Sequence, residues 1–138
     1  MPAIVEAALR SHPARPTHPD AMSRCIEACY ICAGTCTACA DACLSERDVE
    51  GLLGCIRQNL DCAAICLATG SVVARSKAGA SRQILESQLS VCGAACRTCG
   101  DECHRHGEMH RHCRVCAQAC DDCAKACTEM LAALRAVV

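Results

Sequence analysis

Cysteine occupies the inward positions of four long amphipathic segments. The clearest segment carries six cysteines at successive steps of 4, 3, 4, 3 and 4 residues, between Cys25 and Cys43. This alternation averages about 3.5 residues, the repeat at which one helix packs against another in a bundle or coiled coil. The pattern therefore predicts a helix whose buried stripe is made of sulfur.

The same spacing returns in later segments and accounts for all 18 cysteines of the chain. The complete set is Cys25, Cys29, Cys32, Cys36, Cys39, Cys43, Cys55, Cys62, Cys66, Cys92, Cys96, Cys99, Cys103, Cys113, Cys116, Cys120, Cys123 and Cys127. One position breaks the series, because the residue four places after Cys55 is Asn59. Cys55 therefore has no sulfur partner four residues further along its own helix, and any metal that it holds would need a sulfur from another helix or a bridging site.

Turn signals divide the cysteine-bearing segments into four helices. The first is predicted from about Pro19 to Leu44, because proline suits a first helical turn and Asp20 complements its positive end. The second follows a capping signal at Ser45–Asp48 and runs to about residue 75, and the third begins at a Ser81 cap and stops near residue 106. The fourth follows at once.

Four helices joined by short links predict an all-α fold, an antiparallel up-down-up-down four-helix bundle with a cysteine-lined core. We assign the bundle to residues 20–138, a single domain. Residues 1–19 contain all four prolines of the chain, so we expect them to form an N-terminal appendage with one short helix over Ala3–Arg10.

This topology gives the bundle two different ends. One end is an apolar plug, and its predicted members are Met22, Val73, Leu85, Leu89, Met130, Leu134 and Val137. The other end gathers Cys43, Cys55 and Cys103 around the histidine-rich link of residues 104–112. We call this second end the mouth. The tube between plug and mouth is expected to be lined with thiols.

Composition and charge narrow the choice of core and of binding partner. The chain has no Phe, no Trp and one Tyr, so cysteine replaces the large side chains that normally fill a core. Its net charge of −1 gives no case for nucleic acid or an anionic membrane surface. We see neither a leader peptide nor an apolar run of membrane-spanning length, and expect a cytoplasmic protein.

In a reducing compartment, a cysteine-rich pattern points to metal more often than to disulfides. Helix neighbours at i+3 and i+4 have Cβ atoms about 5–6 Å apart, whereas a disulfide needs about 3.5–4.5 Å. Cysteine as a small hydrophobic residue is the other ordinary interpretation. It does not explain 18 cysteines on a common seam, because Leu or Ala would fill the space without a risk of oxidation.

Charge and softness favour Cu(I) as the metal. Thiolates select Cu(I), zinc and iron–sulfur clusters, and a buried thiolate array must be close to neutral when loaded. One Cu(I) per thiol replaces one proton and leaves the charge unchanged. Zinc prefers tetrahedral sites, and we expect a continuous row along a helix to supply pairs rather than tetrahedra. Cu(I) is therefore the predicted metal, in multiple ions per chain, with a zinc–thiolate store as an alternative.

Cysteine pairs with three residues between them, such as Cys25/Cys29, Cys62/Cys66 and Cys123/Cys127, are spread over four predicted helices. In this the chain resembles the cytosolic branch of the bacterial copper storage protein family, over about residues 20–136. The resemblance implies a homotetramer of bundles, with Cu(I) held along each core by the 18 cysteines. It also implies that copper enters at the end bearing the histidines.

Four histidines in nine residues are the candidate ligands at the mouth, with one methionine beside them. His106 continues the inward register of Cys103, and His110 lies three residues before Cys113, so these two rank first. His104 and His112 rank below them, and Met109 is a candidate thioether contact.

The predicted function is non-enzymatic storage and buffering of Cu(I). A thiol redox enzyme is the rival from another class, and we find neither an activated cysteine in a strand-turn-helix context nor a nucleotide-binding loop. A copper chaperone or detoxification protein remains an alternative, with a copper chaperone or efflux protein as partner. Apolar residues expected to face outward suggest association: Ile26, Tyr30, Ile31, Leu53, Ile56, Leu60 and Ile65.

Overall fold

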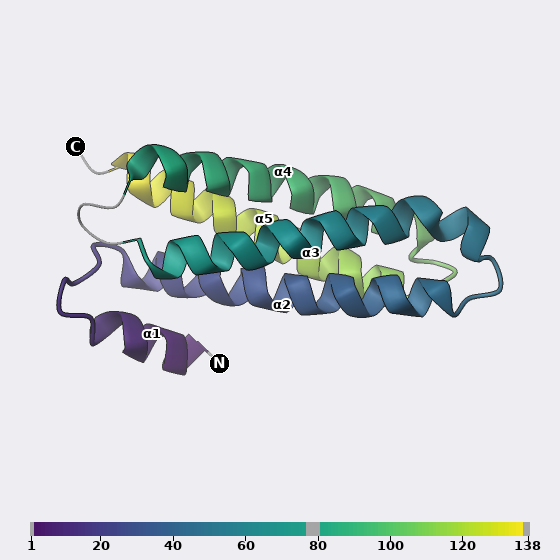
Figure 1. The fold of residues 1–138 in the computed structure, drawn as a ribbon, viewed down its shortest axis with the longest axis horizontal. Helices are drawn as coiled ribbons and strands as arrows, with labels where there is room; N and C mark the ends of the chain where they lie inside the picture. Colours follow the sequence, from purple (N-terminus) through teal and green to yellow (C-terminus); the bar gives the residue numbers. More distant parts are fainter. Residues whose placement is uncertain (1, 77–80, 137–138) are drawn as a thin grey trace.

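Four long helices form an antiparallel bundle, and a short helix lies outside it (Figure 1). The computed structural model describes residues 2–76 and 81–136. Within them, the elements are α1 (Pro2–Arg10), α2 (Pro19–Leu44), the 3-10 helix η1 (Val49–Leu52), α3 (Leu53–Ala74), α4 (Arg82–His106) and α5 (Arg111–Ala136). Both α2 and α4 pack against α3 and α5, so the four helices surround one core. The predicted fold class is confirmed.

Two of the predicted helix starts are confirmed. Pro19 occupies the first turn of α2 and Asp20 lies beside it. The Ser81 hydroxyl accepts a hydrogen bond of 3.3 Å from the Ile84 backbone N–H, so it caps α4 as expected. α3 ends at Ala74, one residue earlier than expected. Residues 77–80 of the link to α4 lie outside the described residues.

The predicted cap at Ser45 is wrong. Ser45 closes the C-terminus of α2, where its backbone N–H reaches the Ala42 carbonyl, and its hydroxyl donates to the Asp41 carbonyl at 3.4 Å. The chain then forms η1 before α3 begins at Leu53. Glycine at residues 51 and 54 disfavours an early α-helical turn here, because each loses more backbone freedom than other residues do. The resulting link brings acidic side chains to the mouth.

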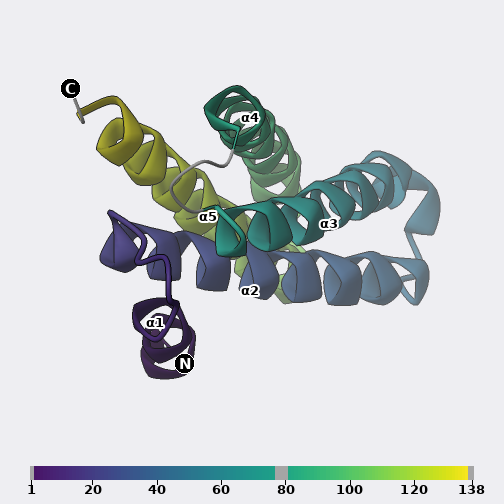
Figure 2. The same ribbon diagram turned by 60° about the vertical axis from the view of Figure 1, so that its left-hand side comes forward.

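The N-terminal helix α1 is docked on the outer side of α2. Figure 2 shows it against α2, on the side away from α4. Leu9 is buried within the same cluster as Ile26, and Arg10 forms an ion pair of 2.7 Å with Asp20. Ile26 and Ile56 were expected to face outward, and both are buried. The reason is that the buried stripe of a bundle helix is wider than a single seam.

Small residues let the helices approach closely. Alanine or glycine directly follows many seam positions and is buried there: Ala33, Ala40, Ala63, Gly70, Gly93, Gly100 and Ala117. A Cβ atom on Gly100 would lie 3.3 Å from the Cβ atom of Cys120 on α5. A short side chain such as cysteine can meet its neighbours across the axis only in a narrow bundle. These positions therefore make the sulfur core possible.

The apolar plug is present at the end where α2 begins and α5 ends. Met22, Val73, Leu85, Leu89 and Met130 are buried, with exposed fractions of 5% or less. Leu134 is half-buried and packs against them. Val137, the last predicted member, lies outside the described residues. This end of the tube is closed by aliphatic side chains.

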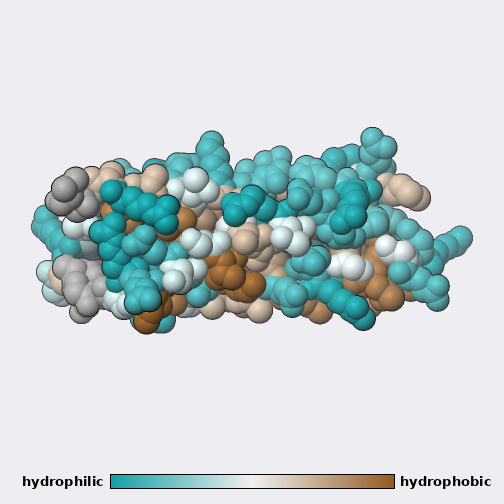
Figure 3. All heavy atoms as spheres, turned by 90° about the horizontal axis from the view of Figure 1, so that it is seen from above, coloured by the Kyte–Doolittle hydropathy of each residue, from teal (hydrophilic) through white to brown (hydrophobic). Residues whose placement is uncertain are grey.

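The face of the molecule drawn in Figure 3 is mainly hydrophilic, with separated hydrophobic patches. One exposed stripe lies on α3, where Leu53, Leu60 and Leu67 recur every seven residues with about half of each side chain exposed. Tyr30 and Ile31 on α2 are also exposed. Among residues 2–76 and 81–136, no helix combines the length and the hydropathy needed to cross a bilayer.

Replacing Gly100 or Gly34 by leucine should affect stability differently, because only Gly100 lies where two helices approach closely. Replacing Gly100 by Leu should destabilise the protein by about 1–3 kcal/mol, because the new side chain separates α4 from α5. Gly34→Leu is the matched control, since a Cβ atom there meets nothing within 4 Å; it should be neutral or stabilising by about 0.5–1 kcal/mol. Anaerobic chemical denaturation of both variants measures the difference, and equal effects would contradict the argument.

Candidate metal centre

Each of the 18 cysteines is free and buried, with an exposed fraction of 1% or less. They come from all four bundle helices, at the positions that the 4/3 spacing predicts. Their sulfur atoms form a nearly continuous column from the plug to the mouth. The predicted inward orientation of the thiols is therefore confirmed.

Neighbouring sulfur atoms lie at similar distances within one helix and between helices. The pair Cys62 and Cys66 on α3 has an Sγ–Sγ distance of 3.9 Å, and Cys36 on α2 lies 3.5 Å from Cys116 on α5. As expected, Cys55 finds its partner on another helix, Cys103, at 3.7 Å. No hydrogen-bonded pair approaches the disulfide length of about 2.05 Å.

These separations suit metal ions held by more than two sulfurs. With a metal–sulfur bond of about 2.3 Å, a linear site needs sulfurs about 4.6 Å apart, and a trigonal site needs about 4.0 Å. The pairs at 3.5 Å and 3.9 Å lie nearer the trigonal value, so these particular sulfurs would have to move apart to hold a linear ion.

The thiols also form groups of four, which the sequence analysis did not expect. Donor atoms within 4.8 Å of one another define Cys29/Cys92/Cys123/Cys127, Cys32/Cys36/Cys62/Cys120, Cys32/Cys62/Cys66/Cys96 and Cys36/Cys99/Cys116/Cys120. Each group draws sulfurs from more than one helix, and the group Cys32/Cys36/Cys62/Cys120 shares two members with each of the two groups that follow it in this series. The expectation that the row offers only pairs is wrong, because it considered neighbours along one helix and not across the axis.

Burial favours the protonated form of the thiols. It raises the pKa of the Cys43 thiol to about 11. Burial, together with the neighbouring Cys39, also raises the pKa of Cys113. A thiolate without a counter-charge is costly in this environment. The empty core therefore holds protons, and a bound cation must replace them.

Asn59 is a polar side chain inside the sulfur column. It is completely buried, and its Oδ1 accepts hydrogen bonds from the thiols of Cys99 and Cys116 at 3.2 Å and 3.3 Å. Its Nδ2 points to the sulfur of Cys55 at 3.8 Å. The amide oxygen therefore accepts thiol protons from α4 and α5, while the amide nitrogen donates to a sulfur on its own helix, α3.

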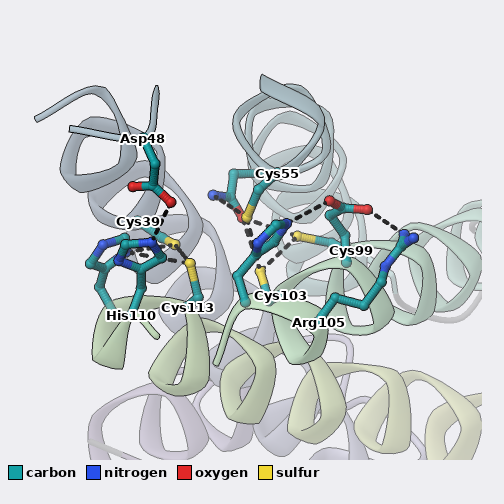
Figure 4. Close-up of polar contacts among 12 residues, drawn as sticks. Cys39, Asp48, Cys55, Cys99, Cys103, Arg105, His110 and Cys113 are labelled. Carbon is teal, nitrogen blue, oxygen red and sulfur yellow. Dashed lines mark hydrogen bonds and ion pairs between the residues drawn. The ribbon is translucent and has the colours of Figure 1, made fainter. Parts of the chain in front are cut away.

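At the mouth, one histidine lies against the first thiols of the column. Nδ1 of His112 lies 3.4 Å from the Cys39 sulfur and 3.6 Å from the Cys113 sulfur. Together with Cys43 these residues form a group of three sulfurs and one nitrogen within 4.8 Å of one another. Figure 4 shows Cys39 of α2 and Cys113 of α5 beside the histidine rings, with Cys55, Cys99 and Cys103 further along.

Carboxylates from the link between α2 and η1 hold the mouth histidines. His112 Nε2 lies 2.9 Å from Glu46 Oε2, and His110 bridges Glu46 at 3.0 Å and Asp48 at 3.1 Å. The hydrogen bond from His112 holds the pKa of Glu46 below its usual value, so this carboxylate is ionised at neutral pH. Glu46 thereby orients the His112 ring, with Nδ1 toward the sulfurs.

A comparison with protein families decides what this arrangement is. Residues 18–132 match the family model described as Csp, copper storage protein. The chain belongs to the copper storage protein family. The match covers the whole sulfur column, and it confirms the resemblance that the cysteine spacing indicated.

Solved structures of related proteins have the same fold. A copper storage protein from Streptomyces lividans, Ccsp, loaded with 10 copper equivalents, is 50% identical, with a TM-score of 0.89 over 93% of this chain and 98% of that one. A cytosolic copper storage protein from the same organism, described with five coppers, is 53% identical, with a TM-score of 0.80 over 82% of this chain and 93% of that one.

A relative from a different organism retains part of the sequence. The uncharacterized cysteine-rich protein YhjQ of Bacillus subtilis (strain 168) is 37% identical over 93 residues, which are 67% of this chain and 80% of that protein.

The histidine that lies closest to the thiols of this copper storage protein is not one of the two that the sequence ranked first. His112, ranked low from the sequence, contacts two thiols. His106 and His104 instead pair with carboxylates, Glu102 and Asp121, each at 3.0 Å. The reason is that α5 begins at residue 111, so its first turn, and not the link before it, faces the end of the column.

The remaining candidates lie outside the column. Met109 is 80% exposed, so its thioether faces solvent rather than the thiols. His110 is buried and stacks on His112, with ring centroids 5.5 Å apart, and its two nitrogens face carboxylates. Sequence reasoning missed Glu46 and Asp48, although an acidic pair in the link opposite a histidine-rich link is the signal that would have found them.

A buried carboxylate in place of Asn59 should disrupt the core. Asn59→Asp places a charge within 3.5 Å of the Cys99 and Cys116 sulfurs, so it should destabilise the empty protein by about 3 kcal/mol at neutral pH. Gln58→Glu is the control, because the same chemical change is made on the preceding, half-buried residue. Anaerobic urea denaturation compares them, and a loss below about 0.5 kcal/mol for Asn59→Asp would contradict this account.

Proposed function

We propose that this chain stores many Cu(I) ions on the thiols of its core. Family membership and the solved copper-loaded relatives support this. The observation that carries the proposal is the burial of 18 free thiols in one column, with nearest distances such as 3.5 Å and 3.9 Å. A single catalytic or transfer site would need far fewer.

The charge balance explains why the stored ion is monovalent. At one Cu(I) per thiol, each ion has replaced one thiol proton, so the net charge of the fully loaded core equals that of the empty core. A divalent ion in a four-thiolate group adds a net charge of −2, which burial penalises strongly. A soft monovalent ion can therefore fill the column to about one ion per sulfur.

Copper is proposed to enter at the mouth, where the column ends in Cys39, Cys43, Cys113 and His112. The opposite end is closed by the aliphatic plug. In the middle of the column the four-thiol groups overlap, and Cys66 lies 3.9 Å from Cys92 and from Cys123 of the group nearer the plug, so an ion inside the column can exchange one ligand at a time. His112 contributes the outermost nitrogen of that route.

The storage role implies a non-enzymatic protein that works in the cytosol, as described for the Streptomyces lividans relative. The exposed stripe of Leu53, Leu60 and Leu67 on α3 supports self-association, and the proposed assembly is a homotetramer. A copper chaperone or efflux protein is the proposed partner for exchange of copper. A role as a chaperone itself would leave most of the column without a purpose.

Anaerobic titration of the empty protein with Cu(I) tests storage. Binding should saturate near one ion per thiol, 18 per chain, and each ion should release about one proton in a weakly buffered solution. Cys62→Ser/Cys66→Ser should lower the capacity by about two ions. Saturation at one to four ions in total, roughly the capacity of a chaperone or a single cluster, would reject storage.

Uptake kinetics test the mouth. His112→Ala removes the nitrogen that lies against two thiols, so it should slow copper uptake about tenfold and lower the final capacity by about one ion at most. His12→Ala is the control, because His12 follows α1 outside the bundle. A stopped-flow measurement with a chromophoric Cu(I) donor gives the rates, and identical rates for both variants would remove His112 from the route.

A further inference from the structure

The group at the mouth differs chemically from the thiol groups behind it. Cys39, Cys43 and Cys113 supply three sulfurs, and His112 supplies Nδ1, all within 4.8 Å of one another. Three cysteines and one histidine are a common ligand set of structural zinc sites, whereas the four groups deeper in the column contain only sulfur. The mouth therefore has the donors for a borderline divalent ion as well as for Cu(I).

The donor distances at the mouth match a tetrahedral zinc site. With Zn–S bonds of about 2.3 Å and Zn–N bonds of about 2.05 Å, an ideal tetrahedron places sulfurs about 3.8 Å apart and sulfur and nitrogen about 3.6 Å apart. The Cys39 and Cys113 sulfurs are 3.9 Å apart, and His112 Nδ1 lies 3.4 Å and 3.6 Å from them. A tetrahedral ion would need only small side-chain movements.

A carboxylate holds the His112 ring, as is usual for a histidine that binds zinc. Its Nε2 donates to Glu46 Oε2 at 2.9 Å, which directs Nδ1 to the sulfurs. A carboxylate behind a ligating histidine fixes the ring and raises its basicity at zinc sites. Because Glu46 holds the ring with Nδ1 toward the sulfurs, the mouth is preorganised for a metal bound through Nδ1.

Charge explains why zinc would remain at the mouth. A Zn²⁺ ion bound there displaces three protons, and three thiolates with a neutral imidazole give the site a net charge of −1. His112 and Cys113 lie in the first turn of α5, whose dipole favours an anion, whereas Cys43 lies in the last turn of α2, whose dipole does not. Because His112 is partly exposed, water screens the remaining charge. In the deeper groups, zinc bound by four thiolates would leave a net charge of −2 within a dry core, which burial penalises strongly.

We propose that the mouth binds one Zn²⁺ ion through Cys39, Cys43, Cys113 and His112, and that this ion closes the tube until Cu(I) displaces it. The inference rests on the proposed function, because the zinc occupies the route by which copper enters. Thiolates bind Cu(I) strongly enough to replace zinc. The bound zinc then keeps the outermost thiols from oxidation when copper is scarce, since a metal-bound thiolate is less available to oxidants.

Zinc binding to the empty full-length chain tests the site. After anaerobic incubation with Zn²⁺ and gel filtration, about one zinc ion per chain should remain. Co²⁺ should bind in its place with the intense visible absorption of a tetrahedral sulfur-rich site. Retention of no zinc, or of several ions per chain, would overturn the proposal.

Variants locate the zinc. His112→Ala and Cys43→Ser should each abolish its retention, and Glu46→Gln should weaken binding about 10–100-fold through the loss of ring orientation. His12→Ala should change nothing. One zinc ion that survives both His112→Ala and Cys43→Ser would lie elsewhere and contradict the site. Near-normal copper capacity of each variant shows that it is folded.

Copper uptake by zinc-loaded protein tests whether the zinc ion closes the tube. Protein preloaded with about one zinc ion should take up Cu(I) more slowly than empty protein and should release the zinc to an indicator dye with the first copper equivalents. Release only after most of the copper has bound, or equal uptake rates, would contradict closure. Copper saturation near 18 ions, measured separately, keeps storage distinguishable from this outcome.

Discussion

The constraint on which this structure depends is the cost of an unpaired charge in a dry core. The thiols of the column are removed from water, so each must carry either a proton or a metal ion. In the empty state the protons are shared among neighbouring sulfurs and with the Asn59 amide. In the loaded state Cu(I) takes their place with the same charge. The bundle can therefore be filled without a change in its electrostatic energy large enough to open it.

This constraint also accounts for the rest of the architecture. Cysteine is short, so the helices must approach closely, and buried glycine and alanine next to the seam permit that approach. Aliphatic residues close one end of the column. The other end combines thiols with imidazoles and carboxylates, which can tolerate partial hydration and charge. Because one end is closed and the other is polar, the fold favours filling of the column from the mouth inward.

Sequence spacing predicted the helices, the inward thiols and the plug because all of these follow from the periodicity of single helices. The features it missed depend on how helices meet. The four-thiol groups need sulfurs from facing helices, such as Cys32 and Cys62 at 3.9 Å, and no spacing along one helix reports that distance. Likewise, Ser45 was mistaken for a helix start because a capping motif does not distinguish an α-helical turn from the 3-10 turn that follows it.

The histidines at the mouth were also ranked wrongly from spacing along single helices. His106 and His110 ranked first because their spacing from Cys103 and Cys113 continues the inward register of the helices. In the structure α4 ends at His106, and the chain turns before α5 begins. The register is lost in that turn, and the carboxylates of Glu46 and Asp48 decide which way the rings face. A link from another part of the sequence therefore sets the geometry of the site.

The most direct test of the central claim is X-ray absorption at the copper edge of the loaded protein. Sulfur neighbours at about 2.2–2.3 Å should dominate the first shell, with short copper–copper distances from ions that share thiolates. The edge should be that of Cu(I) throughout loading. A first shell dominated by nitrogen or oxygen would mean that the thiols are not the store, and the account would be wrong.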